Sequence, residues 1–321
     1  MKVGVIGLGH GSRVLIKAFN LANFEIYGVS SKTNKKTVEL NENYKIYNNW
    51  IDLIKDRKIK IIAIAVPPYL QPKILNECIK YKKIIFAEKP ISANFISSKK
   101  ILHKLLKYNN HFIVDYIFPE HNLFLKFKKL ISKKKNNRAK IKVCFSNKSY
   151  VLVNNIINWK TRDKDGGGLI NLYMPHIIDY IIFLFGDIKK VLRVDNRKNR
   201  FYFEAIFILN NNIEITTKIN SNSRYQNHEI EYENQFSKIK LVNKSKDYAK
   251  HFKLIDFSKT KRNKKIYFDQ RIKTFEDDSR ILLSSKIIKK LKNDFNKKEH
   301  INLINRYLNV EKWINQIKNK I

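Results

Sequence analysis

The stretch Gly7-Leu8-Gly9-His10-Gly11-Ser12 decides the fold through its position between a strand pattern and a helix pattern. The apolar run 3–6 leads into it, and a helix-like stretch over 13–21 follows it. This order is typical of a dinucleotide-binding turn, in which glycine lets a phosphate approach the backbone. The N–H groups at a helix start favour the negative charge of a pyrophosphate. We therefore expect residues 7–12 to bind a dinucleotide; a plain glycine turn in an α/β protein is the alternative.

The end of the second predicted strand bears on the choice of cofactor. A carboxylate about 20 residues past the glycines would accept the ribose 2′-hydroxyl of NAD. The segment there contains no acid and offers Ser30, Ser31 and Lys32 instead. Two hydroxyls and a lysine suit a 2′-phosphate, so we predict NADP in preference to NAD. The alternative is that Lys32 is one more surface lysine.

Composition excludes several classes of protein. With 321 residues and 43% hydrophobic residues, the chain is long enough for two domains with real cores. No stretch approaches 18 uninterrupted apolar residues, so we expect no membrane span. The first strand pattern begins at residue 2, which leaves no room for a signal peptide and predicts a cytoplasmic protein. Cys78 and Cys144 are far apart, and we expect two buried free thiols, without a disulfide or a metal site.

The net charge of +37 raises the hypothesis of nucleic-acid binding. Of the 65 basic residues, 53 are lysine and 12 are arginine, whereas bidentate readers of bases and phosphates rely on arginine. The lysines are spread along the chain, and the dense runs 133–135 and 261–265 are typical of solvated loops. We therefore expect no nucleic-acid partner, but a field that attracts anionic ligands.

The pattern along the chain predicts two domains, 1–118 and 119–321. The first alternates short apolar strands with helices, as in a doubly wound parallel sheet. Its strands are expected over 2–6, 25–30, 59–66, 84–87 and 112–114, and its helices over 13–20, 35–41, 50–55, 70–81 and 97–108.

The second domain is expected to be α+β, with a mostly antiparallel sheet. Asn210-Asn211-Asn212 predicts a hairpin turn between two of its strands. Its strands are expected over 140–145, 191–195, 201–209, 213–219 and 238–242, and its helices over 120–131, 170–185 and 300–317.

Two further segments lie where predicted parallel strands end, at the sheet edge that binds ligands in open α/β folds. One is Val66-Pro67-Pro68, in which the diproline turns the chain away from the sheet. The other is Glu88-Lys89-Pro90, and a pair of opposite charges before a proline is unusual for a solvated surface. We expect both segments to contact the cofactor.

Taken together, these motifs resemble the Gfo/Idh/MocA family of oxidoreductases. The family combines the glycine turn, a strand ending in a diproline and a Glu-Lys-Pro motif. A further match is Trp159, followed by the glycines 166–168 and by His176 eight residues later. The resemblance is clear over about residues 1–185. The wording Trp159-Lys160-Thr161-Arg162 is similar to members from bacterial surface-polysaccharide gene clusters.

This resemblance implies an NAD(P)-dependent oxidoreductase acting on a sugar or nucleotide sugar. The nicotinamide would lie near Pro67 and Lys89. His176 would serve as general base, since an imidazole titrates near physiological pH, and Lys89 would orient the reacting oxygen. Trp159, Arg162 and Asn171 would contact the substrate. The family's antiparallel sheet often forms an interface, which implies a homodimer or homotetramer.

Two positions depart from the family pattern. Many members carry Asp or Asn four residues before the histidine, where this chain has Leu172, and Gln71 stands where a histidine often follows the diproline. Leu172 favours a second hypothesis, a non-catalytic dinucleotide-binding sensor or scaffold. His176 has the alternative of a packed core histidine, and Lys89 of an ion pair with Glu88 or another acid.

Overall fold

Two structural units make up the chain in the computed structural model, which describes residues 1–31, 44–134, 139–196, 200–260, 262–292 and 296–321. Unit 1 comprises residues 1–117, 162–167 and 280–311, and unit 2 comprises 118–161, 168–279 and 312–321. The predicted helix over 35–41 lies outside the described residues.

A parallel sheet in the order β3-β2-β1-β4-β5-β6 forms the centre of unit 1. Its strands are β1 (Lys2–Ile6), β2 (Glu25–Ser30), β3 (Lys45–Tyr47), β4 (Ile59–Ile64), β5 (Ile84–Ala87) and β6 (Phe112–Val114). Its helical segments are η1 (Gly11–Leu15), α1 (Ile16–Leu21), α2 (Trp50–Lys55), α3 (Gln71–Lys80), α4 (Phe95–Tyr108), η5 (Asp163–Asp165), α9 (Ser279–Lys289, of which Ser279 belongs to unit 2), η6 (Lys290–Lys292) and the first part of α10 (Lys297–Lys318). Burial on both faces explains the continuous apolar strands. The predicted doubly wound sheet is confirmed, although β3 was not predicted.

Residues of α10, far along the chain, pack against the parallel sheet of unit 1 and its helices. The hydroxyl of Tyr307 accepts a hydrogen bond from Val114 N at 3.1 Å, and its ring meets Phe112 edge-on. The carboxylate of Glu311, which is 4% exposed, accepts hydrogen bonds from Ser98 Oγ at 2.9 Å and from Ile91 N at 3.3 Å. Helix α10 thus supplies partners for groups on β6 and α4.

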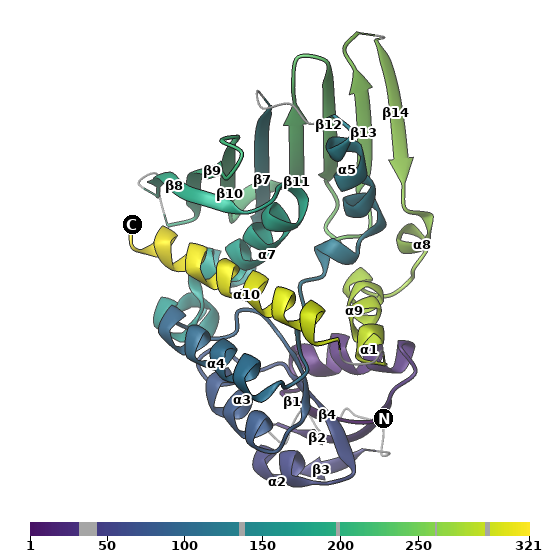
Figure 1. Cartoon of the computed structure of the whole chain (residues 1–321), viewed down its shortest axis with the longest axis vertical. Helices are drawn as coiled ribbons and strands as arrows, with labels where there is room; N and C mark the ends of the chain where they lie inside the picture. Colours follow the sequence, from purple (N-terminus) through teal and green to yellow (C-terminus); the bar gives the residue numbers. More distant parts are fainter. Residues whose placement is uncertain (32–43, 135–138, 197–199, 261, 293–295) are drawn as a thin grey trace. The chain divides into compact units, whose positions relative to one another are not determined.

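In unit 2, the described residues form an eight-stranded sheet in the order β14-β13-β12-β11-β7-β10-β9-β8 (Figure 1). Its pairs are antiparallel except for β7 with β10. The strands are β7 (Lys140–Lys148), β8 (Ile188–Asp195), β9 (Tyr202–Leu209), β10 (Glu214–Asn220), β11 (Asn222–Glu233), β12 (Ser237–Asn243), β13 (Lys253–Ser258) and β14 (Asn263–Phe268). The helical segments are η3 (Phe118–Glu120), α5 (Asn122–Ser132), α6 (Tyr150–Val153), η4 (Trp159–Thr161), α7 (Gly168–Phe185) and α8 (Gln270–Lys273). The α+β prediction and the hairpin between β9 and β10 are confirmed.

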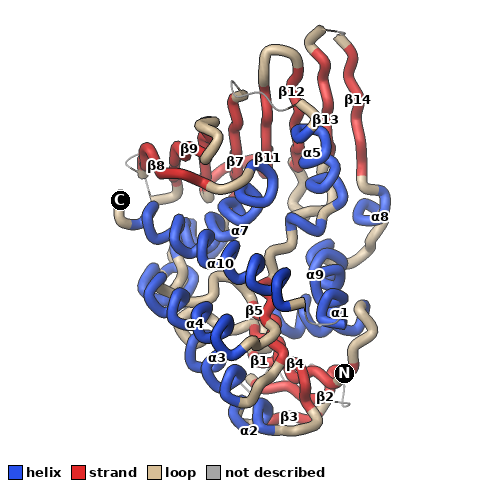
Figure 2. Tube along the Cα trace, viewed as in Figure 1, coloured by secondary structure: helices blue, strands red, loops and turns tan. Residues whose placement is uncertain are grey.

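Helices α5 and α7 pack against the sheet of unit 2 (Figure 2). Side chains alternate between the faces of a strand, so the buried Phe203 and Phe207 of β9 face the helices and Tyr202 faces the other way. On that other face Glu231 of β11 pairs with Lys238 at 3.0 Å and with Lys240 at 2.6 Å, both of β12. Opposite charges on neighbouring strands thus offset one another across this face.

Helix α7 is, among the described residues, the one long and apolar enough to cross a membrane by length and composition. Its 18-residue window is 67% buried within the protein, however, and the helix carries the buried polar residues Asn171, His176 and Asp179. These properties are those of a core helix.

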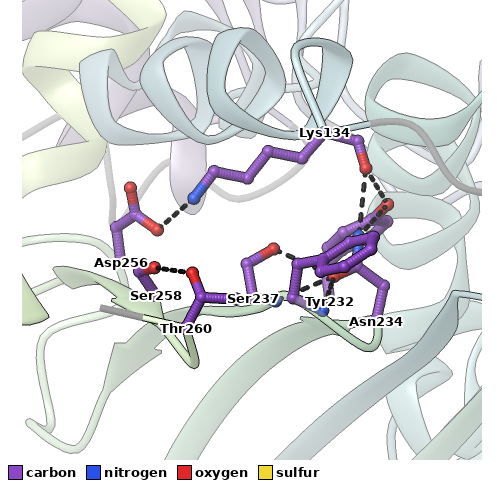
Figure 3. A network of polar contacts seen from close by, with 8 residues as sticks. Lys134, Tyr232, Asn234, Ser237, Asp256, Ser258 and Thr260 are labelled. Atoms are coloured by element: carbon purple, nitrogen blue, oxygen red, sulfur yellow. Dashed lines mark hydrogen bonds and ion pairs between the residues drawn. The ribbon is translucent and has the colours of Figure 1, made fainter. Parts of the chain in front are cut away.

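Lys135 and Lys261 lie outside the described residues, but the described parts of the two lysine runs are not simply solvated loops, which corrects the prediction. Lys134 pairs with Asp256 at 2.5 Å, and its carbonyl oxygen accepts hydrogen bonds from Tyr232 Oη at 2.8 Å and Asn234 Nδ2 at 3.1 Å (Figure 3). These contacts fasten the end of α5 to the sheet. In the second run, residues 263–265 begin β14, whose exposed lysines suit an edge strand.

The cysteines are both free, as predicted, but they differ in burial. Cys78 is buried, and burial raises the pKa of its thiol. Cys144 is half-buried, so the expectation that both thiols are buried is wrong for this residue.

Candidate functional site

The glycine turn closes tightly at the carboxyl end of β1. Gly7 has a φ of 92° and donates its N–H to the Ser30 carbonyl at 2.9 Å. A Cβ on Gly7 would overlap the carbonyl oxygen of Ala65, so a side chain has no room there. Ser12 Oγ donates to the Leu8 carbonyl, and the helical run starts at Gly11. A tight turn that opens a helix fits a pyrophosphate.

The serines of the predicted cofactor segment follow the neighbouring strand β2. Ser30 is buried and holds the glycine turn through its carbonyl oxygen, whereas Ser31 is half-buried. Lys32 lies outside the described residues.

The diproline and the Glu-Lys-Pro segment are joined by Gln71. This side chain is fully buried at the start of α3, and its Nε2 donates to the carbonyl oxygens of Glu88 at 3.0 Å and Pro90 at 2.9 Å. Val66 and Pro67 are half-buried, Pro68 is buried, and the Lys89–Pro90 peptide bond is cis. Gln71, which departs from the family pattern, is therefore a structural clamp between the two predicted segments.

Gly166 brings a later segment of the chain to the diproline. A Cβ on Gly166 would lie 2.5 Å from Pro68 Cβ, so the backbone passes very close to that ring. Arg162, a predicted substrate contact, is exposed and pairs with Asp165 at 2.5 Å at the start of this segment. Residues 162–167 thus belong to unit 1, next to the predicted cofactor segments.

Glu88 pairs with a residue of the glycine turn. Its Oε1 lies 2.7 Å from Nε2 of His10. Burial raises the pKa of Glu88, but His10, Lys89 and Arg280 together hold it below its usual value. His10 pairs with Glu88 at hydrogen-bonding distance, and an ion pair of Lys89 with Glu88 or another acid stays the alternative for Lys89. Lys89 acts on Glu88 through its charge.

Asp115 is the member of this cluster that the sequence did not predict. It follows β6, is 3% exposed, and accepts a hydrogen bond from Ser284 Oγ of α9 at 2.8 Å. Burial and the nearby Glu88 carboxylate raise its pKa well above the usual range, so Asp115 retains a proton more readily than an exposed aspartate. Its position after the sixth parallel strand was the available signal.

His10, Glu88 and Asp115 each place one possible metal-ligand atom within 4.8 Å of the others. The positive charges of Lys89 and Arg280 already act on these carboxyls and would oppose a divalent cation. A proton shared within the cluster fits these charges better than a metal ion does, so the absence of a metal stays our prediction.

The predicted base, His176, lies in unit 2 on α7, directly after Pro175. It is 7% exposed and meets the ring of Phe118 edge-on at 5.5 Å between centroids. The ring of Tyr248, which also packs on Phe118, lies 6.0 Å away and is tilted by 54°. An aromatic setting of this kind holds the imidazole in one orientation.

The other predicted substrate residues are divided between environments. Asn171 is buried one turn before His176, and Trp159 is half-buried on η4. The glycine turn, Ser30, Ser31, the diproline, Glu88, Lys89 and Arg162 lie in unit 1, whereas Trp159, Asn171 and His176 lie in unit 2. The structure brings the first set to one edge of one sheet. That Lys89 and His176 meet over a substrate stays a prediction.

Comparison with known proteins supports the predicted resemblance. Residues 1–116 match the model of the Gfo/Idh/MocA oxidoreductase family, described as having an NAD-binding Rossmann fold. An oxidoreductase of Synechocystis sp. is 25% identical over 191 residues, which are 58% of this chain and 52% of that protein. The myo-inositol 2-dehydrogenase of Thermotoga maritima is 25% identical over 111 residues, 33% of each chain. The match thus spans about half of the Synechocystis protein and a third of the Thermotoga maritima protein.

Solved structures share the fold over the whole chain. A 3-ketoreductase from Actinomadura kijaniata, solved with NADP and TDP-benzene, has a TM-score of 0.82 at 10% identity and covers 100% of this chain and 97% of its own. A levoglucosan dehydrogenase solved with NADH has a TM-score of 0.81 at 13% identity, with 100% and 96% covered. Such low identities show the common fold alone. The family match covers the glycine turn, the diproline and the Glu-Lys-Pro segment, so residues 1–116 are similar to the NAD-binding Rossmann part of the Gfo/Idh/MocA oxidoreductases.

Proposed function

We propose that this chain transfers a hydride between NAD(P) and the hydroxyl or keto carbon of a sugar or nucleotide sugar. The observation that carries the proposal is the meeting of three motifs at one sheet edge in unit 1. These motifs are the glycine turn, the diproline and the Glu88-Lys89 segment, tied together by Gln71 and by the His10–Glu88 pair. Bound at this edge, NAD(P) would supply the hydride acceptor or donor.

Lys89 and His176 are the residues to which we assign the chemistry. Lys89 would hold the reacting oxygen and offset its developing negative charge, and His176 would take or return the hydroxyl proton. Trp159, Arg162 and Asn171 would contact the sugar. The low exposure of His176 is also what a packed core histidine would show, so the test must separate the two roles.

The first experiment is a titration of the protein with NADPH and with NADH, followed by nicotinamide fluorescence. We expect micromolar binding that Lys89→Ala weakens, whereas Lys100→Ala, an exposed lysine on α4, leaves it unchanged. No binding of either cofactor would overturn the proposal.

We further propose NADP as the preferred cofactor, supported by Ser30, Ser31 and Lys32 and by the missing acid after β2. Ser31→Asp would repel a 2′-phosphate and accept a ribose 2′-hydroxyl. The ratio of NADPH to NADH affinity should therefore fall at least tenfold, which corresponds to about 1.4 kcal/mol. An unchanged ratio would show that Ser31 does not face the ribose.

Nucleotide sugars are the first substrates to screen, because a solved structure of the same fold holds TDP-benzene and because Trp159-Lys160-Thr161-Arg162 resembles members from surface-polysaccharide clusters. His176→Gln should abolish turnover while cofactor affinity persists. A homodimer or homotetramer is part of the same proposal, and sedimentation would measure it.

A non-catalytic sensor or scaffold is the second candidate. Leu172 on α7 favours it, since leucine cannot hydrogen-bond a substrate or orient the histidine. This candidate requires cofactor binding without turnover of any sugar. If this candidate is right, Leu172→Asp, which restores the family pattern, should produce sugar turnover that the wild-type protein lacks.

A further inference from the structure

The loop of residues 243–250, between β12 and β13, is held by an unusually dense set of hydrogen bonds. Asn243, which is 1% exposed, donates from Nδ2 to the Asp247 carbonyl at 2.9 Å and accepts at Oδ1 from Ser245 N at 2.9 Å. Asp247 Oδ1 accepts hydrogen bonds from Ala249 N at 3.0 Å and Lys250 N at 2.7 Å. The loop therefore has little freedom to change its backbone.

Two buried side chains from other parts of unit 2 also form hydrogen bonds with this loop. Ser279 Oγ donates to Asp247 Oδ1 at 2.5 Å. His121, fully buried at the start of α5, accepts from Leu123 N at Nδ1, so its Nε2–H donates to the Ala249 carbonyl at 3.1 Å. Two other regions of unit 2 thus hold this short loop, and such support can fix the position of a side chain that the loop carries.

The side chain that this loop presents is Tyr248. It is half-buried, whereas its neighbours Phe118 at 5.2 Å, His176 at 6.0 Å and His228 at 6.5 Å between ring centroids are buried. Among these rings, Tyr248 is therefore the one with partial access to solvent. Its ring packs beside the imidazole of His176, which is itself only 7% exposed.

Three titratable side chains of unit 2 lie close to His176 in sequence or in the same aromatic cluster: Tyr180, His228 and Asp179. Tyr180 follows it by one turn on α7, and its hydroxyl lies 3.2 Å from His228 Nε2 on β11. Burial lowers the pKa of His228 to about 3, so this histidine is neutral at physiological pH. Burial also raises the pKa of Tyr180, and Asp179 is buried on the same helix. Burial disfavours the charged form of an imidazole, so a ring that covers His176 would act on its pKa.

We propose that Tyr248 is a positioning residue for His176, held against it by the hydrogen-bonded loop 243–250. The ring limits the orientations open to the imidazole and limits its contact with water. The inference rests on the proposed function only where turnover is concerned. The contact itself can be tested without a substrate.

The experiment is an NMR titration of the protein labelled at histidine, with His176→Gln used to assign the His176 signal. Tyr248→Ala should admit water and raise the pKa of His176 by about half a unit or more. Tyr248→Phe keeps the ring and should restore the original value. Asp247→Ala, which loosens the loop but keeps the tyrosine, should move the pKa in the same direction as Tyr248→Ala.

The matched control is Tyr202→Ala, which removes a half-buried tyrosine from the opposite face of the same sheet. An unchanged His176 pKa in Tyr248→Ala, or an equal change in Tyr202→Ala, would overturn the proposal. In steady-state assays, Tyr248→Ala should lower kcat about tenfold with little change in KM, and its pH profile should move with the imidazole pKa. If the wild-type protein turns over no sugar, the proposed function fails, and the NMR titration still decides the role of Tyr248.

Discussion

The glycine turn allows a quantitative test of the fold at the predicted cofactor site. At Gly7, a φ of 92° costs an alanine about 1–2 kcal/mol relative to glycine. The new Cβ would also overlap the Ala65 carbonyl oxygen, which belongs to the backbone and cannot rotate away. Relief of that overlap must disturb the hydrogen bonds Gly7 N to Ser30 O at 2.9 Å and Ala65 N to Ile6 O at 2.8 Å, each worth about 1 kcal/mol. Gly7→Ala should therefore lower the free energy of unfolding by about 3–4 kcal/mol.

Two other glycines provide the controls for this prediction. Gly186 has a φ of 95°, but a Cβ there would meet nothing within 4 Å, so Gly186→Ala should cost about 1–2 kcal/mol. At Gly11 a Cβ would meet Val5 Cγ1 at 3.1 Å, and that side chain can adjust. Gly11→Ala should therefore lie within about 1 kcal/mol of the wild type. Urea unfolding followed by circular dichroism measures all three variants. If Gly7→Ala costs no more than Gly186→Ala, the steric argument is wrong.

Three further predictions concern buried polar groups of unit 1. Gln71→Leu removes both hydrogen bonds to the Glu88 and Pro90 carbonyls and should lower the free energy of unfolding in urea by about 2–3 kcal/mol. A loss under about 1 kcal/mol would contradict the role of Gln71 in joining the two segments. Lys83→Met removes hydrogen bonds from Nζ to the carbonyls of Asp56 at 2.8 Å and Ile59 at 2.5 Å, so its Tm should fall by several degrees, while exposed Lys100→Met leaves Tm unchanged. Burial and the nearby His111 lower the pKa of His300 to about 4, so the folded state prefers the neutral ring. The stability that the neutral ring contributes is fully present above about pH 6.5 and is lost as the pH falls toward 4. The drop in unfolding free energy between pH 7 and pH 5 should be smaller in His300→Leu, and an equal drop would rule out this histidine as its source.

The sequence could predict the elements whose burial is continuous. Apart from β3, which is mostly exposed and was not predicted, the parallel strands of unit 1 are largely buried and apolar, so their positions were predicted to within two residues. β11 was missed because only part of it, near His228 to Tyr232, alternates with buried side chains, while its first half is polar and exposed. β14 was missed because an edge strand rich in lysine has the composition of a loop.

The candidate site was predictable where it depends on local motifs and unpredictable where distant side chains meet. The turn at residues 7–12 and the segment Glu88-Lys89-Pro90 are contiguous, so their chemistry is visible in the sequence. The contacts of Gln71 with Glu88 and Pro90, and of Asp115 with Ser284, join residues separated by 17 to 169 positions. No local pattern reports such a pair, because register and helix packing decide it.

Residues 280–311 belong to unit 1 and supply hydrogen-bond partners to its first 117 residues. The first 117 residues are therefore not expected to be stable without them. A fragment ending near residue 118 would keep every strand of the Rossmann sheet, yet it would lack Ser284, Tyr307 and Glu311, which satisfy polar groups on β6, on α4 and after β5. Recombination that exchanged only the amino-terminal third with a homologue would mismatch these partners. Substitutions in the first 118 residues and in α10 are therefore expected to be coupled, although about 180 residues of sequence separate the two segments.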